Sequence, residues 1–195
     1  MRPFLFWVRF VAVHMFLLSW ILPLPVILYV FLQDPLKGIY LFLIGCIPMP
    51  KSPLYQSIIS MLKPWRYFKA TIEMKSQIKE HQLLCFHPHG IFTNGVTWNF
   101  RLRSEFQYIG VMMSWKLRYM PFMRWHFDLL GGNRFHDISR ETMKKQMSQG
   151  KTLSMLPGGY DEASLCKMGE ERIFIRDRKG FIKYALQFGY DIRPV

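Results

Sequence analysis

The chain has 195 residues, of which 50% are hydrophobic and 16% aromatic, and its formal net charge is +13. An apolar and strongly basic chain is unusual for a cytosolic enzyme and suits a protein lodged in a bilayer with an anionic surface. We expect no nucleic-acid partner, because the chain lacks a basic helix, a zinc-ligand spacing and an aromatic RNA-binding strand, and its three scattered cysteines form no disulfide framework.

The N-terminal region is dominated by apolar runs. The first run, from Phe4 to Leu22, is about as long as one bilayer crossing requires. Pro23 and Pro25 break it, and further apolar stretches cover residues 26–32 and 38–47. The polar residues of the first run are Arg9, His14 and Ser19.

We interpret residues 1–50 as a membrane-embedded hydrophobic hairpin with the prolines near its turn. Basic residues flank it on both sides and favour both ends in the cytosol, which an even number of crossings or a re-entrant hairpin satisfies. These residues are Arg2, Arg9, Lys51, Lys63, Arg66 and Lys69. A signal peptide is the alternative, but no small-residue cleavage site follows the first run and the hydrophobicity resumes at once.

Residues 51–80 contain a basic amphipathic segment. The spacing of its apolar side chains predicts a helix with Pro64 as a kink, and a tryptophan on such a helix fits a membrane interface. The apolar side chains are Leu54, Ile58, Met61, Leu62, Trp65, Phe68 and Ile72. A helix packed on a globular core is the alternative.

Residues 81–195 alternate between strand-like and helix-like segments. This alternation predicts an α/β fold with a parallel or mixed sheet and flanking helices. Strands are predicted at 82–86, 106–113, 152–156 and 190–195, and helices at 90–103, 115–130 (kinked at Pro121), 139–149 and 177–188. Expected caps are Ser139 or Asp137 with Gly150, and Asp177 with Gly189. Because the last strand begins just before Val195, we expect this domain to be incomplete at its C-terminal side.

The motif His87-Pro88-His89-Gly90 directly follows the predicted strand at 82–86. In α/β sheets, ligands bind at the carboxyl ends of strands. A neutral imidazole there can accept the proton of an attacking hydroxyl, and it does so better when a carboxylate orients its other nitrogen. The motif therefore indicates a general base.

The motif Pro157-Gly158-Gly159-Tyr160-Asp161-Glu162 follows the predicted strand at 152–156. Backbone N–H groups of such a turn could hold an anion, either a developing oxyanion or a phosphate. Glu162 or Asp161 could then face the histidines.

Other interpretations of these residues stay open. His87 and His89 could share a metal with a third ligand, or each imidazole could be satisfied by backbone carbonyls, although no H-E-x-x-H or Cys/His set supports a metal. The candidate third ligands are Glu162, His126 and His136. Arg172, Arg176 and Arg178 could bind phosphates or form a solvated basic face. We expect His126, Asp128, His136 and Asp137 to be surface or packing residues.

Several blocks in order resemble the family of diacylglycerol and monoacylglycerol acyltransferases that is distinct from the multi-span membrane-bound O-acyltransferases. The five blocks are Phe86-His87-Pro88-His89-Gly90, then Pro121-Phe122-Met123-Arg124, then Ser139-Arg140-Glu141 after Gly131-Gly132, then Pro157-Gly158-Gly159-Tyr160-Asp161-Glu162-Ala163-Ser164-Leu165, and finally Arg178-Lys179-Gly180-Phe181 with Ala185, Gly189, Pro194 and Val195. The N-terminal hydrophobic hairpin is also in the place where the family has one.

The resemblance implies transfer of a fatty acyl group from acyl-CoA to the hydroxyl of a mono- or diacylglycerol. It implies a catalytic part that faces the cytosol at the endoplasmic reticulum membrane, and the lipid droplet as a further location. Acyl-CoA would be a co-substrate with no bound cofactor and no metal, and membrane lipid would be the other partner. A homo-oligomer is a further option, and a wax alcohol or retinol is an alternative acceptor.

The resemblance also assigns roles to residues. It also implies a distant relation to the wider group of glycerolipid acyltransferases that carry an H-x4-D motif, and alignment with that pattern makes His89 the expected general base with His87 in support. The acid of the wider pattern is missing here, because Thr93 stands four residues after His89 and Ile91 four after His87. Glu162 is therefore the expected carboxylate partner. The expected substrate-binding residues are Pro88, Gly90, Pro157, Gly158, Gly159, Arg178, Gly180 and Phe181. The alternative function is that of an inactive, truncated isoform that docks on the membrane or binds a partner.

Overall fold

The structure, a computed structural model, describes residues 3–68, 72–73, 76–87, 93, 96–97, 102–167, 169–170 and 172–195. Pro88, His89, Gly90 and most of the helix predicted at 90–103 lie outside these residues. The chain divides into two compact units. We call Met1–Lys69 with Ser114–Phe135 the helical unit, and Ala70–Met113 with His136–Val195 the sheet unit.

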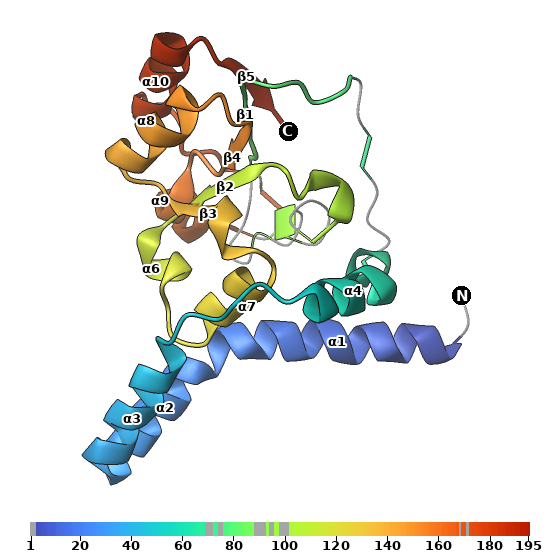
Figure 1. Cartoon of the computed structure of the whole chain (residues 1–195), viewed down its shortest axis with the longest axis vertical. Coiled ribbons are helices and arrows are strands. Elements are labelled where there is room, and N and C mark those ends of the chain that lie inside the picture. Colours follow the sequence, from blue (N-terminus) through green and yellow to red (C-terminus); the bar gives the residue numbers. More distant parts are fainter. Residues whose placement is uncertain are drawn as a thin grey trace. The chain divides into compact units, whose positions relative to one another are not determined.

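The sheet unit is built on a five-stranded sheet with the order β3-β2-β4-β1-β5 (Figure 1). Its strands are β1 (Gln82–Cys85), β2 (Gly110–Met113), β3 (Phe135–Asp137), β4 (Leu153–Met155) and β5 (Asp191–Pro194). β1 pairs in parallel with both β4 and β5, and β2 pairs in parallel with β4. The predicted α/β class is thereby confirmed, whereas the three-residue strand β3 was missed.

Both faces of the sheet are covered by apolar side chains. Successive residues of a strand point to opposite faces, so Leu83 and Cys85 belong to one core and Leu84 to the other. The first core includes residues of α8 (Arg140–Ser148) and α10 (Gly180–Phe188), which pack against each other. Burial on both faces explains why β1 reads as a continuous apolar run rather than an alternating one.

The ends of these two helices test the predicted caps. Ser139 precedes α8, and its Oγ accepts the N–H of Thr142 at 3.3 Å, which confirms the predicted N-cap. The predicted cap at Asp177 is wrong, because α10 begins only at Gly180 and Lys179 before it makes no side-chain cap. Gly189 ends α10 in the left-handed conformation, as predicted.

The helical unit begins with the helices described in residues 3–68. They are α1 (Pro3–Ile21), α2 (Pro23–Gln33), α3 (Pro35–Gly45), α4 (Pro53–Leu62) and the 3-10 turn η1 (Pro64–Arg66). The segment Ser114–Phe135 adds α6 (Trp115–Arg118), α7 (Met123–Leu129) and the 3-10 turn η4 (Gly132–Arg134). Two short elements of the sheet unit complete the description, η3 (Ser104–Phe106) and α9 (Gly159–Ser164).

The apolar hairpin is formed by α2 and α3, which lie side by side (Figure 1). The chain reverses at Asp34, next to Pro35, whereas helical hydrogen bonds continue through Leu22 on both sides of the junction at Pro23. Asp34 caps α3 by accepting the N–H of Lys37 at 3.2 Å. A Cβ at Gly38 would lie 2.4 Å from the Cα of Phe31, so only glycine lets α2 approach this closely.

At two prolines where we predicted a kinked helix, the helix is interrupted instead. α4 stops at Leu62, Lys63 adopts a left-handed conformation with φ of 48°, and Pro64 opens η1. The helix predicted at 115–130 is likewise divided at Pro121 into α6 and α7. A proline removes one helical N–H and clashes with the preceding turn, which accounts for both breaks.

Candidate functional site

The carboxyl ends of β4, β1 and β5 lie at one edge of the sheet because the three strands are parallel. Cys85 at the end of β1 is the register partner of both Met155 and Pro194. The pairing continues past the strands, since the N–H of Phe86 donates to the carbonyl of Met155 at 3.0 Å and that of His87 to Val195 at 3.4 Å. Three sequence blocks that are far apart in the chain therefore end next to one another.

His87 is the described residue of the histidine motif, and it is half-buried at this edge. His89, the expected base, and its neighbours Pro88 and Gly90 lie outside the described residues. Thr93 adopts φ of 46°, and its Oγ1 lies 3.2 Å from the Oγ1 of Thr97. Thr93 thus takes part in a local hydroxyl pair at the position where the wider pattern has an acid.

Glu162 lies at the same edge, on the first turn of α9, which follows β4. Its side chain is only 2% exposed, and Oε2 accepts the N–H of Phe174 at 3.1 Å. The carboxylate folds back over the turn, since a Cβ at Gly158 would lie 2.2 Å from Oε2. A buried carboxylate held by a hydrogen bond suits a group that orients an imidazole.

The two glycines of the turn serve different purposes. Gly158 leaves room for the Glu162 carboxylate, whereas Gly159 adopts φ of 58° with nothing near its missing side chain. The N–H of Gly159 donates to the carbonyl of Leu156 at 3.2 Å, so this amide, one candidate for holding an anion, already has a partner. Pro157, before the glycines, is buried.

The expected substrate-binding residues after α9 fall into two groups. Arg178 forms an exposed ion pair with Asp161, and its guanidinium lies 5.5 Å from the centre of the Phe174 ring. Arg178 therefore contacts the same segment, at Phe174, whose N–H binds Glu162. Gly180 begins α10, and Phe181 is a buried residue of the first core. Arg178 thus lies beside the turn that leads to Glu162, and Phe181 packs α10 against the sheet.

A second polar cluster, in the helical unit, was missed by the sequence reasoning. Asp128, on α7, is 5% exposed, and its two oxygens accept from Arg118 at 2.7 Å and Arg124 at 3.1 Å. Arg124 also donates to the carbonyl of Cys46 at 3.0 Å, and Asp128 accepts the N–H of Met49 at 3.2 Å. The block Pro121-Phe122-Met123-Arg124 therefore binds, through Arg124, the linker that leaves the apolar hairpin.

His126 is half-buried, and its packed ring agrees with the expectation that it and Asp128 are surface or packing residues. Its Nδ1 lies 2.7 Å from the hydroxyl of Tyr55, and its Nε2 lies 2.6 Å from the Oγ of Ser19. Because Ser19 donates its own proton to the carbonyl of Phe16, the chain of bonds fits a neutral imidazole protonated on Nε2. Burial lowers the pKa of His126 to about 4 and raises that of Tyr55 to about 12, so both groups are neutral at pH 7.

The alternative that the histidines bind a metal ion can be compared with the part of the chain that the structure describes. No three His, Cys, Asp or Glu side chains there are grouped so that they could hold a metal ion. Both ring nitrogens of His126 have hydroxyl neighbours, which makes it unavailable as the third ligand considered above.

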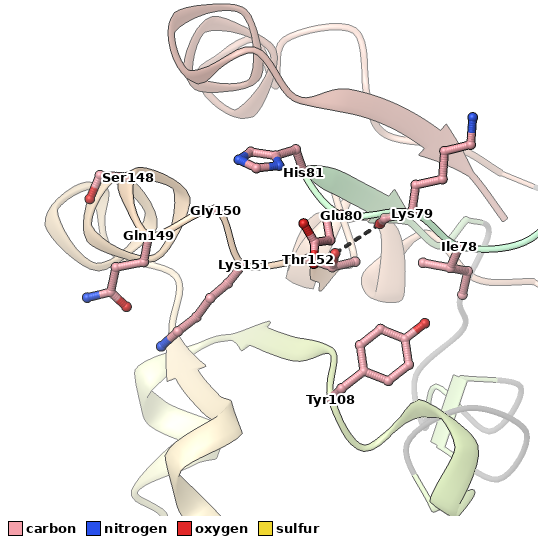
Figure 2. Close-up of a pocket in the computed structure, with 10 residues that line it drawn as sticks. All are labelled: Ile78, Lys79, Glu80, His81, Tyr108, Ser148, Gln149, Gly150, Lys151 and Thr152. Atoms are coloured by element: carbon pink, nitrogen blue, oxygen red, sulfur yellow. Dashed lines mark hydrogen bonds between the residues drawn. The ribbon is translucent and has the colours of Figure 1, made fainter.

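An open pocket of about 570 Å³ lies at the opposite, amino edge of the sheet (Figure 2). Its lining comes from the segments that precede β1, β2 and β4, and the hydroxyl of Thr152 donates to the carbonyl of Lys79 across it at 3.0 Å. His81, which lines the pocket, immediately precedes β1, and His87 lies beyond the end of β1. The pocket is therefore separate from the edge that holds His87 and Glu162.

The fold and these side chains define a class of protein: an α/β protein with a parallel sheet whose carboxyl edge holds a histidine and a buried carboxylate, joined to an apolar helical unit. The sequence model of the diacylglycerol acyltransferase family matches residues 53–195. The chain belongs to this family, as the blocks quoted from the sequence indicated.

Individual relatives agree with the family assignment. The chain is 28% identical over 146 residues to diacylglycerol O-acyltransferase 2-like protein 6 of Homo sapiens, with 67% of the chain and 42% of the relative covered. It is 29% identical over 154 residues to diacylglycerol O-acyltransferase 2 of Xenopus tropicalis, with 67% and 40% covered. It is 31% identical over 149 residues to 2-acylglycerol O-acyltransferase 1 of Mus musculus, with 67% and 43% covered. The chain thus matches about two fifths of the length of these relatives, and no solved structure matches it.

Proposed function

We propose that the chain provides the histidine and carboxylate of an acyl-CoA-dependent O-acyltransferase that acts on mono- or diacylglycerol. The enzyme works at the endoplasmic reticulum membrane with its sheet unit on the cytosolic side. Family membership supports acyl transfer to a glycerolipid, and the names of the relatives supply the two acceptor classes. The apolar helices α1, α2 and α3 support a site that meets its lipid substrates at the bilayer.

The meeting of three family blocks at one edge of the sheet is the observation on which this proposal rests. β1 leads to His87, β4 leads through the double-glycine turn to Glu162, and β5 brings Val195 beside His87. Glu162 is buried, and its carboxylate accepts the N–H of Phe174. Burying a carboxylate is costly, so this arrangement differs from that of an ordinary surface glutamate, which stays in water.

In the proposed reaction, His89 accepts the proton of the acceptor hydroxyl as its oxygen attacks the thioester carbonyl carbon. Glu162 or His87 holds the imidazole in the required orientation and stabilises its charged form. Collapse of the tetrahedral intermediate breaks the carbon–sulfur bond, and the CoA thiolate takes the proton back from the imidazolium. The oxygen–carbon bond of the new ester replaces the broken thioester, so atoms and charges balance. Arg178, beside the carboxylate turn, is the candidate contact for the CoA phosphates.

Microsomes from cells that express the chain test this proposal with labelled acyl-CoA and either acylglycerol. We expect ester formation above the level of control microsomes, a loss of about 100-fold or more in His89→Ala, and a smaller loss in His87→Ala and Glu162→Gln. His136→Ala, on the edge strand β3, is the matched control and should keep most of the activity. Unchanged turnover in His89→Ala would contradict the mechanism, and no turnover by the chain at all would contradict the function. Wax alcohols and retinol, added to the same assay, test the alternative acceptors.

A further inference from the structure

One face of α1 is packed against the rest of the helical unit along almost its whole length. The residues on this face follow a helical spacing, and they are Phe6, Arg9, Val13, Phe16 and Trp20. Near the start of α1, the Nε of Arg9 donates to the carbonyl of Leu62 at 2.9 Å. Near its end, Ser19 contacts His126 at 2.6 Å. Two of the three polar residues of α1, Arg9 and Ser19, therefore have partners elsewhere in the helical unit, while the third, His14, bonds to the carbonyl of Phe10 within α1 itself.

The opposite face of α1 is an exposed apolar stripe. Its residues recur every three or four positions and share one side of the helix. They are Phe4, Trp7, Val11, Met15, Leu18 and Leu22, with side chains 47–74% exposed. We call these six residues the α1 stripe. Length and composition alone make α1 the one helix among the described residues that could cross a membrane.

The partners of α1 are too short to accompany it across a bilayer. α4 runs beside it, since Leu62 at the end of α4 contacts Arg9, while Tyr55 near its beginning contacts the same histidine as Ser19. The ten residues of α4 span about 15 Å, against about 30 Å for the hydrocarbon core.

Charged groups stand at both ends of this packed region. Lys63 and Arg66 follow the end of α4. Asp128 lies on α7 two residues after His126, and its partners are Arg118 on α6 and Arg124 on α7. A crossing α1 would place one of these charged groups inside the hydrocarbon, where a charge is costly. An α1 parallel to the bilayer plane keeps both groups outside the hydrocarbon.

Lipid is the occupant that suits the α1 stripe. The stripe continues at Leu22 into α2 and α3, whose side chains are apolar and largely exposed, and whose one charged pair, Asp34 and Lys37 at the reversal, is joined at 3.0 Å. Phe4 and Trp7 are aromatic, as is common at a membrane interface, and the same unit exposes Lys63 and Arg66 for an anionic leaflet. Six large apolar side chains in a row exceed what a monomer leaves in water.

We propose that α1 is an in-plane membrane helix, which lies along one interface of the bilayer with the α1 stripe among the acyl chains and its other face on α4 and α7. This inference concerns how the chain meets the membrane, and it holds whether or not the proposed catalysis is correct. Although α1 is long enough to cross the bilayer, in this arrangement it binds the membrane from one side only.

Depth measurements on the α1 stripe distinguish the two arrangements. In the full chain with Cys46→Ser and Cys166→Ser, and with Cys85 left in place because it is buried, spin labels are attached at Phe4→Cys, Val11→Cys or Leu18→Cys. The protein is reconstituted on phosphatidylcholine–phosphatidylserine vesicles, and collisions with oxygen and with an aqueous nickel complex report depth. We expect one similar, shallow apolar depth at all three positions. A maximum at Val11 would show a crossing helix, and aqueous values at all three would show a helix away from lipid; either result overturns the proposal.

A charge placed on the α1 stripe gives an independent test. Met15→Glu should move the Val11 label toward water, whereas Leu186→Glu should leave it unchanged. Leu186 is the matched control because it is equally apolar, 79% exposed, and lies on α10 in the sheet unit. Equal effects of the two variants would contradict the proposal. If thermal unfolding shows that Met15→Glu does not fold, the depth profile of the other positions alone decides.

Discussion

At the scale of single residues, Asp128 shows how a buried carboxylate fixes the polypeptide around it. Two arginines from α6 and α7 neutralise it, and through Met49 and Arg124 it holds the linker between α3 and α4. Such a cluster has little net value compared with an apolar core, but it becomes costly once one partner is removed. Its role is therefore to fix where the linker runs.

Asp128→Asn should lower the free energy of unfolding by about 3–5 kcal/mol, because it leaves the 8% exposed guanidinium of Arg118 buried without its counter-charge. Denaturant unfolding in detergent micelles measures the change. Glu170→Gln is the control, since Glu170 also pairs with two cations, Lys167 and Arg172, but at the surface. There the expected cost is small, because solvent screens an exposed ion pair. Similar costs for the two variants would mean that the Asp128 cluster is not buried as described.

His126 should make stability depend on pH. Burial lowers its folded pKa from 6.5 to about 4, so the unfolded chain takes up the proton first as the pH falls. The stability from the neutral imidazole is complete above about pH 6.5, is lost between pH 6.5 and 4, and amounts to about 3 kcal/mol. Thermal unfolding of wild type and His126→Gln at pH 7 and pH 4.5 isolates this contribution. The variant should lose less stability between the two pH values, and an equal loss would contradict the assignment.

At the scale of elements, the turn between β4 and α9 determines where the Glu162 carboxylate lies. Gly158→Ala should expel the carboxylate from its place over the turn, because the new Cβ would lie 2.2 Å from Oε2. We expect a loss of most acyl transfer and of about 1–3 kcal/mol in stability. Gly159→Ala is the matched control, since it strains a φ of 58° by about 1 kcal/mol but meets no side chain. Equal losses of activity would show that backbone strain, and not the carboxylate, matters.

The elements that could be predicted from the sequence are those with local signals. The apolar run of β1, the Ser139 cap and the left-handed Gly189 each depend on neighbours in the chain, and each is confirmed. The short strand β3 has three residues and no apolar alternation, so no local pattern marks it. The start of α10 was placed too early because Asp177 is a good cap by type, whereas the segment before Gly180 packs over α9 through Arg178 and Asp161.

The candidate site, too, has features that could be predicted from the sequence and features that could not. That His87 and Glu162 lie at one sheet edge follows from the order of strands and motifs, and therefore could be predicted. The contact of Glu162 with Phe174 depends on a loop without regular pattern, and the Asp128 cluster depends on residues 79 positions apart along the chain. Contacts of that kind are set by tertiary packing and have no periodic signal in the sequence.

At the scale of the whole molecule, the chain passes from the helical unit to the sheet unit and returns. The segment Ser114–Phe135 follows β2 but packs with the N-terminal residues. There the N–H of Phe122 donates to Gly45 at 3.0 Å, the N–H of Ser52 donates to Leu129 at 3.1 Å, and the indole of Trp125 donates to Ile47 at 3.0 Å. The apolar N-terminal region is thus a structural partner of a segment within the family-matched residues, and it is more than a detachable anchor.

Removal of residues 1–52 should therefore destabilise the family-matched part of the chain. A 53–195 fragment loses the acceptors at Gly45 and Ile47 and the linker contacts of Arg124, and it exposes the apolar side chains of α7. We expect it to aggregate or to bind an apolar dye strongly, in detergent as well as in buffer, and to show a lower unfolding temperature than the full chain. Co-expression of residues 1–52 as a separate peptide is the control, since the missing contacts can form in trans and should restore solubility. A fragment that is as stable alone as in the full chain would show that the N-terminal region only tethers the protein to the membrane.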